Sequence, residues 1–87
     1  MKLYTVTAEI TYVIAVEGDT DPWFIAQEAW SEVKYETDES QIDFFVGKEI
    51  KSVEDLPSDW DVMCIPYGDG DGNTRIGDMI SEGVINA

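Results

Sequence analysis

The sequence predicts an α+β domain, because a strand-like alternation near the N-terminus is followed directly by a helix-like apolar stripe. Even-numbered residues from Tyr4 to Val16 are apolar or aromatic, as in a strand with one buried face. The next segment has the apolar spacing of a core-facing helix, with Ile25, Ala26, Ala29, Trp30 and Val33 on one side. Later strand signals precede a second helix. The expected order is β-α-β-β-α, a small mainly antiparallel sheet with both helices packed on one face.

The first strand is expected over Leu3–Glu17. A straight strand of this length would span roughly 50 Å, too long for a small domain, so we expect a bend or bulge near Ala8–Thr11. Asp21 suits the N-cap of the first helix and Pro22 its first position. This helix should end near residue 34.

The second half of the chain contains weaker signals, and we expect residues 1–87 to form a single domain. A strand is predicted within Gln41–Val53, with a bulge or turn at Gly47. Ser52–Leu56 has the pattern of one capped helical turn, and Trp60–Tyr67 that of a short strand. A last helix should begin after Thr74 and bury three apolar residues: Ile76, Met79 and Ile80.

The charge is the most unusual property of the composition. Nineteen Asp and Glu residues stand against five Lys and Arg, a formal net charge of −14, while 44% of residues are hydrophobic, as in a folded chain. A field of this sign attracts basic surfaces and repels nucleic acid and anionic membranes. The predicted partner is therefore a basic protein, such as a nucleic-acid-binding host enzyme. The alternative is an acidic accessory protein whose charge serves only solubility.

The residue types argue against an enzyme. The chain has no histidine, so no imidazole base and no Ser-His or Cys-His pair can form. Cys64 lies in an apolar run, where a buried, inert thiol is expected. No signal peptide or apolar span of membrane length is recognised, so the cytoplasm is the expected location.

A metal site is the second hypothesis for the function. Asp69, Asp71 and Asn73 occupy positions 1, 3 and 5 of an EF-hand-like loop. However, Thr74 stands where that loop needs glycine, and Ile80 where it needs the bidentate glutamate. Weak Ca²⁺ binding by this Asp/Gly-rich loop, within residues 68–78, stays an alternative, and no other cofactor is expected.

The acidic residues form regular groups that could bind a basic partner. Glu28, Glu32 and Glu36 recur every ~6 Å along the predicted helix, a spacing comparable with that of neighbouring phosphates on one nucleic-acid strand. Like charges at this spacing destabilise a helix, so a row that is nearly without neutralising lysines indicates a use in binding. Such an acidic row could compete with DNA or RNA for a phosphate-binding groove. The predicted partner-binding residues are Glu28, Glu32, Glu36, Asp38, Glu39, Asp43, Glu54, Asp55, Asp59 and Asp61.

Four aromatic residues stand next to acids and would suit an interface if exposed: Trp23, Phe24, Tyr35 and Trp60. Trp23 can extend the edge of the buried helix stripe. Phe24 falls on the side of Glu28, either partly exposed or covered by the following loop. A homodimer through strand edges also stays open, and would favour a structural role.

The chain resembles the small acidic proteins that bacteriophages encode to block host enzymes, including nucleic-acid-mimicking antirestriction and anti-CRISPR proteins. The resemblance rests on size, charge, the lack of histidine, and the opening Tyr4-Thr5-Val6-Thr7-Ala8-Glu9, which leads through DTDPW into a helix. It implies a phage or mobile-element origin and an inhibitory role. It assigns no function to any single residue.

Overall fold

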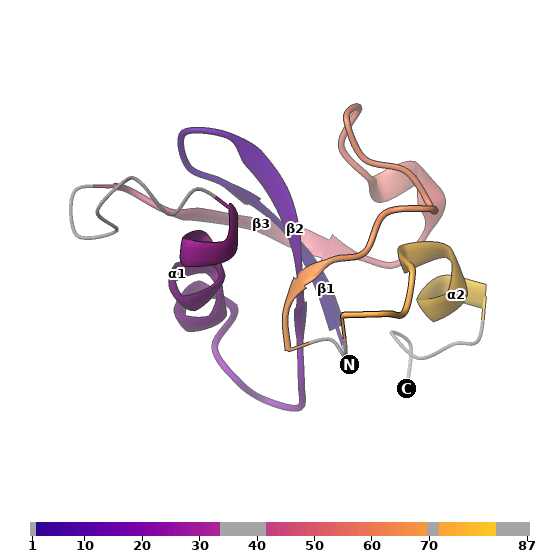
Figure 1. The fold of residues 1–87 in the computed structure, drawn as a ribbon, viewed down its shortest axis with the longest axis horizontal. Helices are drawn as coiled ribbons and strands as arrows, with labels where there is room; N and C mark the ends of the chain where they lie inside the picture. Colours follow the sequence, from indigo (N-terminus) through magenta and orange to yellow (C-terminus); the bar gives the residue numbers. More distant parts are fainter. Residues whose placement is uncertain (1, 34–41, 70–71, 82–87) are drawn as a thin grey trace.

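A computed structural model describes residues 2–33, 42–69 and 72–81, and shows a four-stranded sheet in the order β3-β1-β2-β4 (Figure 1). The elements are β1 Lys2–Thr7, β2 Thr11–Val16, α1 Pro22–Val33, β3 Phe45–Ile50, the 3-10 turn η2 Val53–Asp55, β4 Tyr67–Gly68 and α2 Ile76–Ser81. The β1–β2 and β1–β3 pairs are antiparallel and the short β2–β4 pair is parallel. The predicted α+β class and mainly antiparallel sheet are confirmed.

The expected first strand is a hairpin of two strands. β1 and β2 pair from Lys2 with Val16 to Thr7 with Thr11, and the chain reverses at residues 8–10. The bend expected near Ala8–Thr11 is thus found at that place, but there the chain reverses its direction completely. Because the pairing joins even-numbered residues to even-numbered ones, the alternating residues still share one face, as with Tyr4 and Ile14.

Helix α1 packs on the face of the sheet formed by these even-numbered residues. The side-chain oxygen of Asp21 accepts a hydrogen bond of 3.0 Å from the amide of Trp23, so the predicted N-cap is confirmed. Four of the predicted stripe residues are buried, and Val33 is partly buried against them. The buried cluster on this face contains Val6, Tyr12, Ile14, Val16, Ile25, Ala26, Ala29, Trp30 and Phe44.

Helix α2 packs on the opposite face, so the prediction that both helices share one face is wrong. Its buried residues Ile76 and Met79 belong to a second cluster, with the odd-numbered residues Leu3, Val13 and Ala15 of β1 and β2 and with Ile50 of β3. Figure 1 shows the sheet between the two helices. The reason is the second apolar face of β2: residues 12–16 are all buried, so each face of this strand needs its own cover.

The remaining elements follow the predictions unevenly. The pairing of β1 with β3 shifts between Tyr4 and Val6, which places the expected bulge at Gly47. The capped turn before Pro57 is η2. The predicted strand over Trp60–Tyr67 is wrong, because that segment contains a turn at Val62 and Met63 and otherwise no regular structure until its last residue enters β4. Among the described residues, no helix has the length and apolar character needed to cross a membrane.

Candidate functional site

The predicted acidic row on α1 is partly visible in the structure. Glu28 and Glu32 lie one helical turn apart with exposed side chains, on the edge of α1 that runs beside the buried residues Ile25 and Ala29. Asp43 is also exposed, just before β3. Glu36, Asp38 and Glu39 lie outside the described residues.

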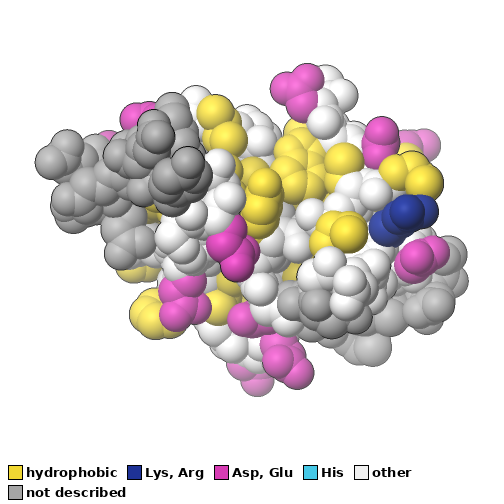
Figure 2. All heavy atoms as spheres, viewed as in Figure 1, with side chains coloured by type: hydrophobic (Ala, Val, Ile, Leu, Met, Phe, Trp, Pro, Cys, Tyr) yellow, Lys and Arg dark blue, Asp and Glu magenta, His cyan; other side chains and the backbone are white. Residues whose placement is uncertain are grey.

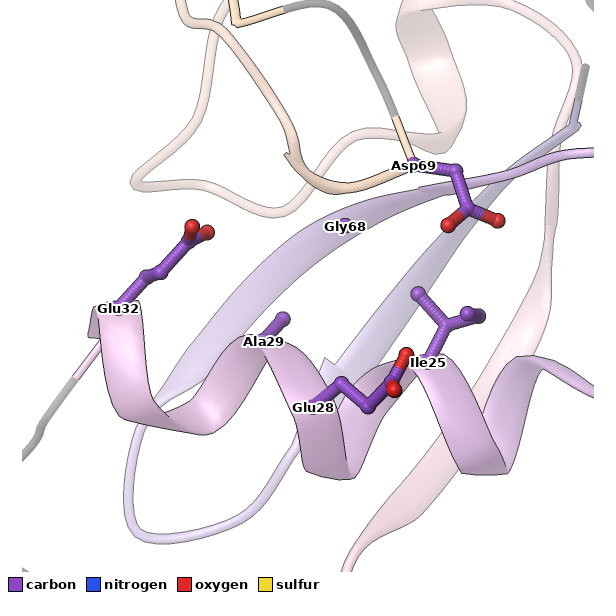
Figure 3. Close-up of a pocket in the computed structure, with 6 residues that line it drawn as sticks. All are labelled: Ile25, Glu28, Ala29, Glu32, Gly68 and Asp69. Atoms are coloured by element: carbon purple, nitrogen blue, oxygen red, sulfur yellow. The ribbon is translucent and has the colours of Figure 1, made fainter.

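An open cavity of about 120 Å³ lies between α1 and the end of β4. Its lining contains three acidic residues, Glu28, Glu32 and Asp69, and no basic one; Ile25, Ala29 and Gly68 complete it. In Figure 3, the carboxylates of Glu28 and Asp69 extend towards the space beside Ile25, and Glu32 projects from the next turn of the helix. The fold therefore unites two of the α1 glutamates with an aspartate that the sequence placed in a different group.

Asp69 is held in place by two contacts with β2 and the residue after it. Its amide donates a 2.9 Å hydrogen bond to the carbonyl oxygen of Ala15, which continues the parallel pairing of β4. Its Oδ2 atom accepts a 3.0 Å hydrogen bond from the amide of Glu17. Asp69 thus lines the cavity from a backbone that is paired with the sheet.

Gly68 allows β4 to approach α1 closely enough to form this cavity. Its φ angle is +91°, and a Cβ atom at this position would lie 2.7 Å from the carbonyl oxygen of Ala15 and 2.8 Å from Cγ2 of Ile25. Only glycine fits such a position without a shift of the backbone. By composition this glycine belongs to the Asp/Gly-rich loop, and nothing local in the sequence indicates its contact with the helix.

The second predicted acidic group is divided between structural and exposed carboxylates. Oδ2 of Asp55 accepts hydrogen bonds from the amides of Lys51 and Ser52, and its Oδ1 lies 3.3 Å from Nζ of Lys48. These donors, the Lys51 amide first, lower the pKa of Asp55. Asp55 thus closes the η2 turn.

Asp61 plays a similar local role in the next turn. Its Oδ1 accepts a 2.8 Å hydrogen bond from the amide of Met63 and lies 3.6 Å from Sγ of Cys64. Glu54 and Asp59 are exposed. Within the second acidic group, Glu54 and Asp59 are therefore the carboxylates for which the described structure shows no hydrogen bond that supports a turn.

The predicted calcium loop is only partly described. Asp69 faces the amide of Glu17 and the cavity, Asn73 is exposed, and Asp71 lies outside the described residues. Within residues 2–33, 42–69 and 72–81, no three His, Cys, Asp or Glu side chains are grouped so that they could hold a metal ion. The hypothesis of a Ca²⁺ site thus gains no support from the part of the loop that is described.

The acidic side chains of the visible face lie in several separate places, and hydrophobic side chains reach the surface between them (Figure 2). Among the residues that the structure describes, the basic side chains visible in this view lie on its right-hand side. Comparison of the chain with protein-family models, with curated proteins and with solved structures found no match. What the protein binds must therefore be inferred from the chemistry of its own surface.

Proposed function

We propose that this protein is a non-catalytic acidic binding protein that mimics nucleic acid, in the manner of a phage-encoded inhibitor. It would occupy the cationic site of a nucleic-acid-binding or defence enzyme in the host cytoplasm. The observation that supports this most directly is the cavity between α1 and β4, whose lining includes Glu28, Glu32 and Asp69 and no Lys or Arg. A Lys or Arg side chain of the partner is the group that such a lining attracts.

The arrangement favours binding over catalysis. The carboxylates of Glu28 and Glu32 are exposed on a helix, a rigid element that holds them one turn apart. The chain contains no histidine, and Cys64 packs against the cluster on the other face of the sheet from α1. A net charge of −14 adds a long-range field that steers basic surfaces towards the protein and keeps DNA and RNA away.

Binding to a nucleic-acid site can be tested by competition. The immobilised protein is incubated with bacterial proteins that were first retained on a DNA column, and their release is measured against NaCl and against added duplex DNA. We expect release at moderate salt, because exposed charge pairs are screened, and release by DNA, because both ligands use the same groove. Retention that is insensitive to both salt and DNA would refute the proposal.

Two variants of equal charge change locate the site. The double variant Glu28→Gln/Glu32→Gln should weaken binding on the order of five-fold, since each exposed pair contributes about 0.5 kcal/mol. The matched variant Glu54→Gln/Asp59→Asn removes two exposed carboxylates near η2 and should bind as the unmodified protein does. If the η2 variant loses more affinity than the α1 variant, the partner does not dock on α1.

A further inference from the structure

The first turn of α1 exposes two large aromatic side chains next to each other. Trp23 is 50% exposed and Phe24 is 56% exposed. Helical geometry places Phe24 on the side of α1 away from the sheet, four residues before Glu28 and therefore on the same stripe. The expectation that Trp23 extends the buried stripe is wrong, and Phe24 is one of the most outward-facing residues of the helix.

These two rings are not needed to close the core. The aromatic contacts of the α1 face join Tyr12 to Trp30 with ring centroids 5.9 Å apart, and Trp30 to Phe44 at 5.6 Å. That cluster is already buried. Isolated apolar side chains are common on protein surfaces, whereas here one helical turn exposes two large aromatic side chains, Trp23 and Phe24, of the kind that often anchors interfaces.

The surroundings of the two rings are acidic. Residues 17–33 contain five acidic residues and no Lys or Arg: Glu17, Asp19, Asp21, Glu28 and Glu32. Exposed rings on a segment of this charge are complementary to a partner segment that combines apolar and basic side chains. A second copy of this chain would bring the same negative charge, and anionic lipid or nucleic acid would be repelled, so charge selects a basic polypeptide.

We propose that the outward face of α1, defined by Phe24, Glu28 and Glu32 with Trp23 at its opposite edge, is the docking surface for a basic amphipathic segment of a protein partner. Apolar side chains of that segment cover the two rings, and its Lys or Arg side chains reach the carboxylates and the cavity beside Asp69. Guanidinium groups can also stack on the ring of Trp23. This proposal rests on the proposed function, and adds to it an apolar anchor that salt does not screen.

Two synthetic helical peptides serve as probes. One alternates Leu and Lys so that it is amphipathic, and the other keeps every Lys but replaces Leu by Gln. Calorimetric titration should show that the Leu/Lys peptide binds about ten-fold more tightly, the effect of one well-packed aromatic anchor. The preference should persist at high salt, where the Lys/Gln peptide no longer binds. Equal affinities for the two peptides would overturn the proposal.

Variants separate the anchor from the charge. Trp23→Gln/Phe24→Gln, which keeps good helix formers in α1, should remove the preference for the Leu/Lys peptide. Phe45→Thr on β3, where the phenylalanine is 66% exposed, is the matched control and should keep the preference. Circular dichroism and thermal melting check that each variant is folded. If the double variant proves unstable, the single variant Phe24→Leu takes its place and should keep part of the preference for the Leu/Lys peptide.

Amide chemical-shift mapping with the Leu/Lys peptide completes the test. Shifts should concentrate on residues 21–32 and on Asp69. If the peptide shifts the β3 edge or the turn at Met63 instead, or if Phe45→Thr abolishes the preference, the docking surface is not on α1. If both peptides bind with equal, salt-sensitive affinity, the aromatic anchor is refuted. The acidic site of the proposed function is tested separately, by the DNA competition experiment.

Discussion

The phenol of Tyr12 donates a 2.8 Å hydrogen bond to the carbonyl oxygen of Ala26, and so joins the centre of β2 to the centre of α1. Both residues are fully buried. The ring of Tyr12 also contacts Trp30 on the helix and Tyr67 on β4. One side chain therefore ties together the three elements that frame the acidic cavity.

Replacing Tyr12 by Phe should destabilise the protein by about 1 kcal/mol, since the ring contacts stay and one buried hydrogen bond is lost. Burial also raises the pKa of Tyr12. The unfolded chain then loses the phenol proton at a lower pH than the folded chain, so this group lowers stability as the pH rises above about 10. Urea unfolding between neutral and alkaline pH should show this fall in the native protein and a smaller one in Tyr12→Phe. An equal alkaline loss in both proteins would contradict the prediction.

Replacing Asp55 by Asn should lower the stability of the η2 turn. The amide of Lys51 and the ammonium of Lys48 lower the pKa of Asp55 in the folded state, so its carboxylate stabilises the fold above the unfolded pKa. That contribution is lost as the pH falls through the acid range. The difference in melting temperature between the native protein and Asp55→Asn should therefore be present at neutral pH and shrink in acid. The exposed Asp59, changed to Asn, is the control and should show no such difference.

The core could largely be predicted from the sequence, because it depends on local periodicity. The stripe of α1 and the even-numbered face of the first two strands were correct, and the Asp21 cap was found from its position before Pro22. The reversal at Ala8-Glu9-Ile10 was not, since these residues include no Gly, Pro, Asn or Asp to mark a turn. Unbroken alternation across that turn made two strands look like one.

The candidate site was predicted less well, because it depends on contacts between distant residues. The exposure of Glu28 and Glu32 follows from helical spacing alone. Their meeting with Asp69 requires the parallel pairing of β4 with β2, which joins Ala15 to Gly68 and has no local signal. The structural role of Asp55 is local by contrast: its carboxylate accepts hydrogen bonds from the amides of Lys51 and Ser52, within the capped turn that the sequence predicts at Ser52–Leu56.

Neutralising the α1 glutamates should stabilise the isolated protein slightly while it weakens binding. Glu28 and Glu32 are like charges four residues apart, an arrangement that costs a few tenths of a kcal/mol, roughly 0.3. Urea unfolding at low salt should show Glu28→Gln/Glu32→Gln to be more stable by about this amount, and high salt should remove the gain. A loss of stability instead would mean that these carboxylates support the fold, and that their exposure is not a sign of binding.

The contact of Gly68 with α1 can be tested by comparing two glycines with similar backbone angles. Gly68 has φ +91° and Gly72 has φ +79°, but a Cβ atom would meet the neighbouring chain only at Gly68. Gly72→Ala should cost about 1 kcal/mol, the strain of a left-handed residue. Gly68→Ala should cost a further 1–3 kcal/mol or so, because the new methyl group overlaps Ala15 and Ile25. It should also weaken binding of the Leu/Lys peptide, since β4 must move away from the helix. Equal losses of stability in the two variants would show that β4 does not pack against α1 at this distance, and would remove the structural basis of the cavity.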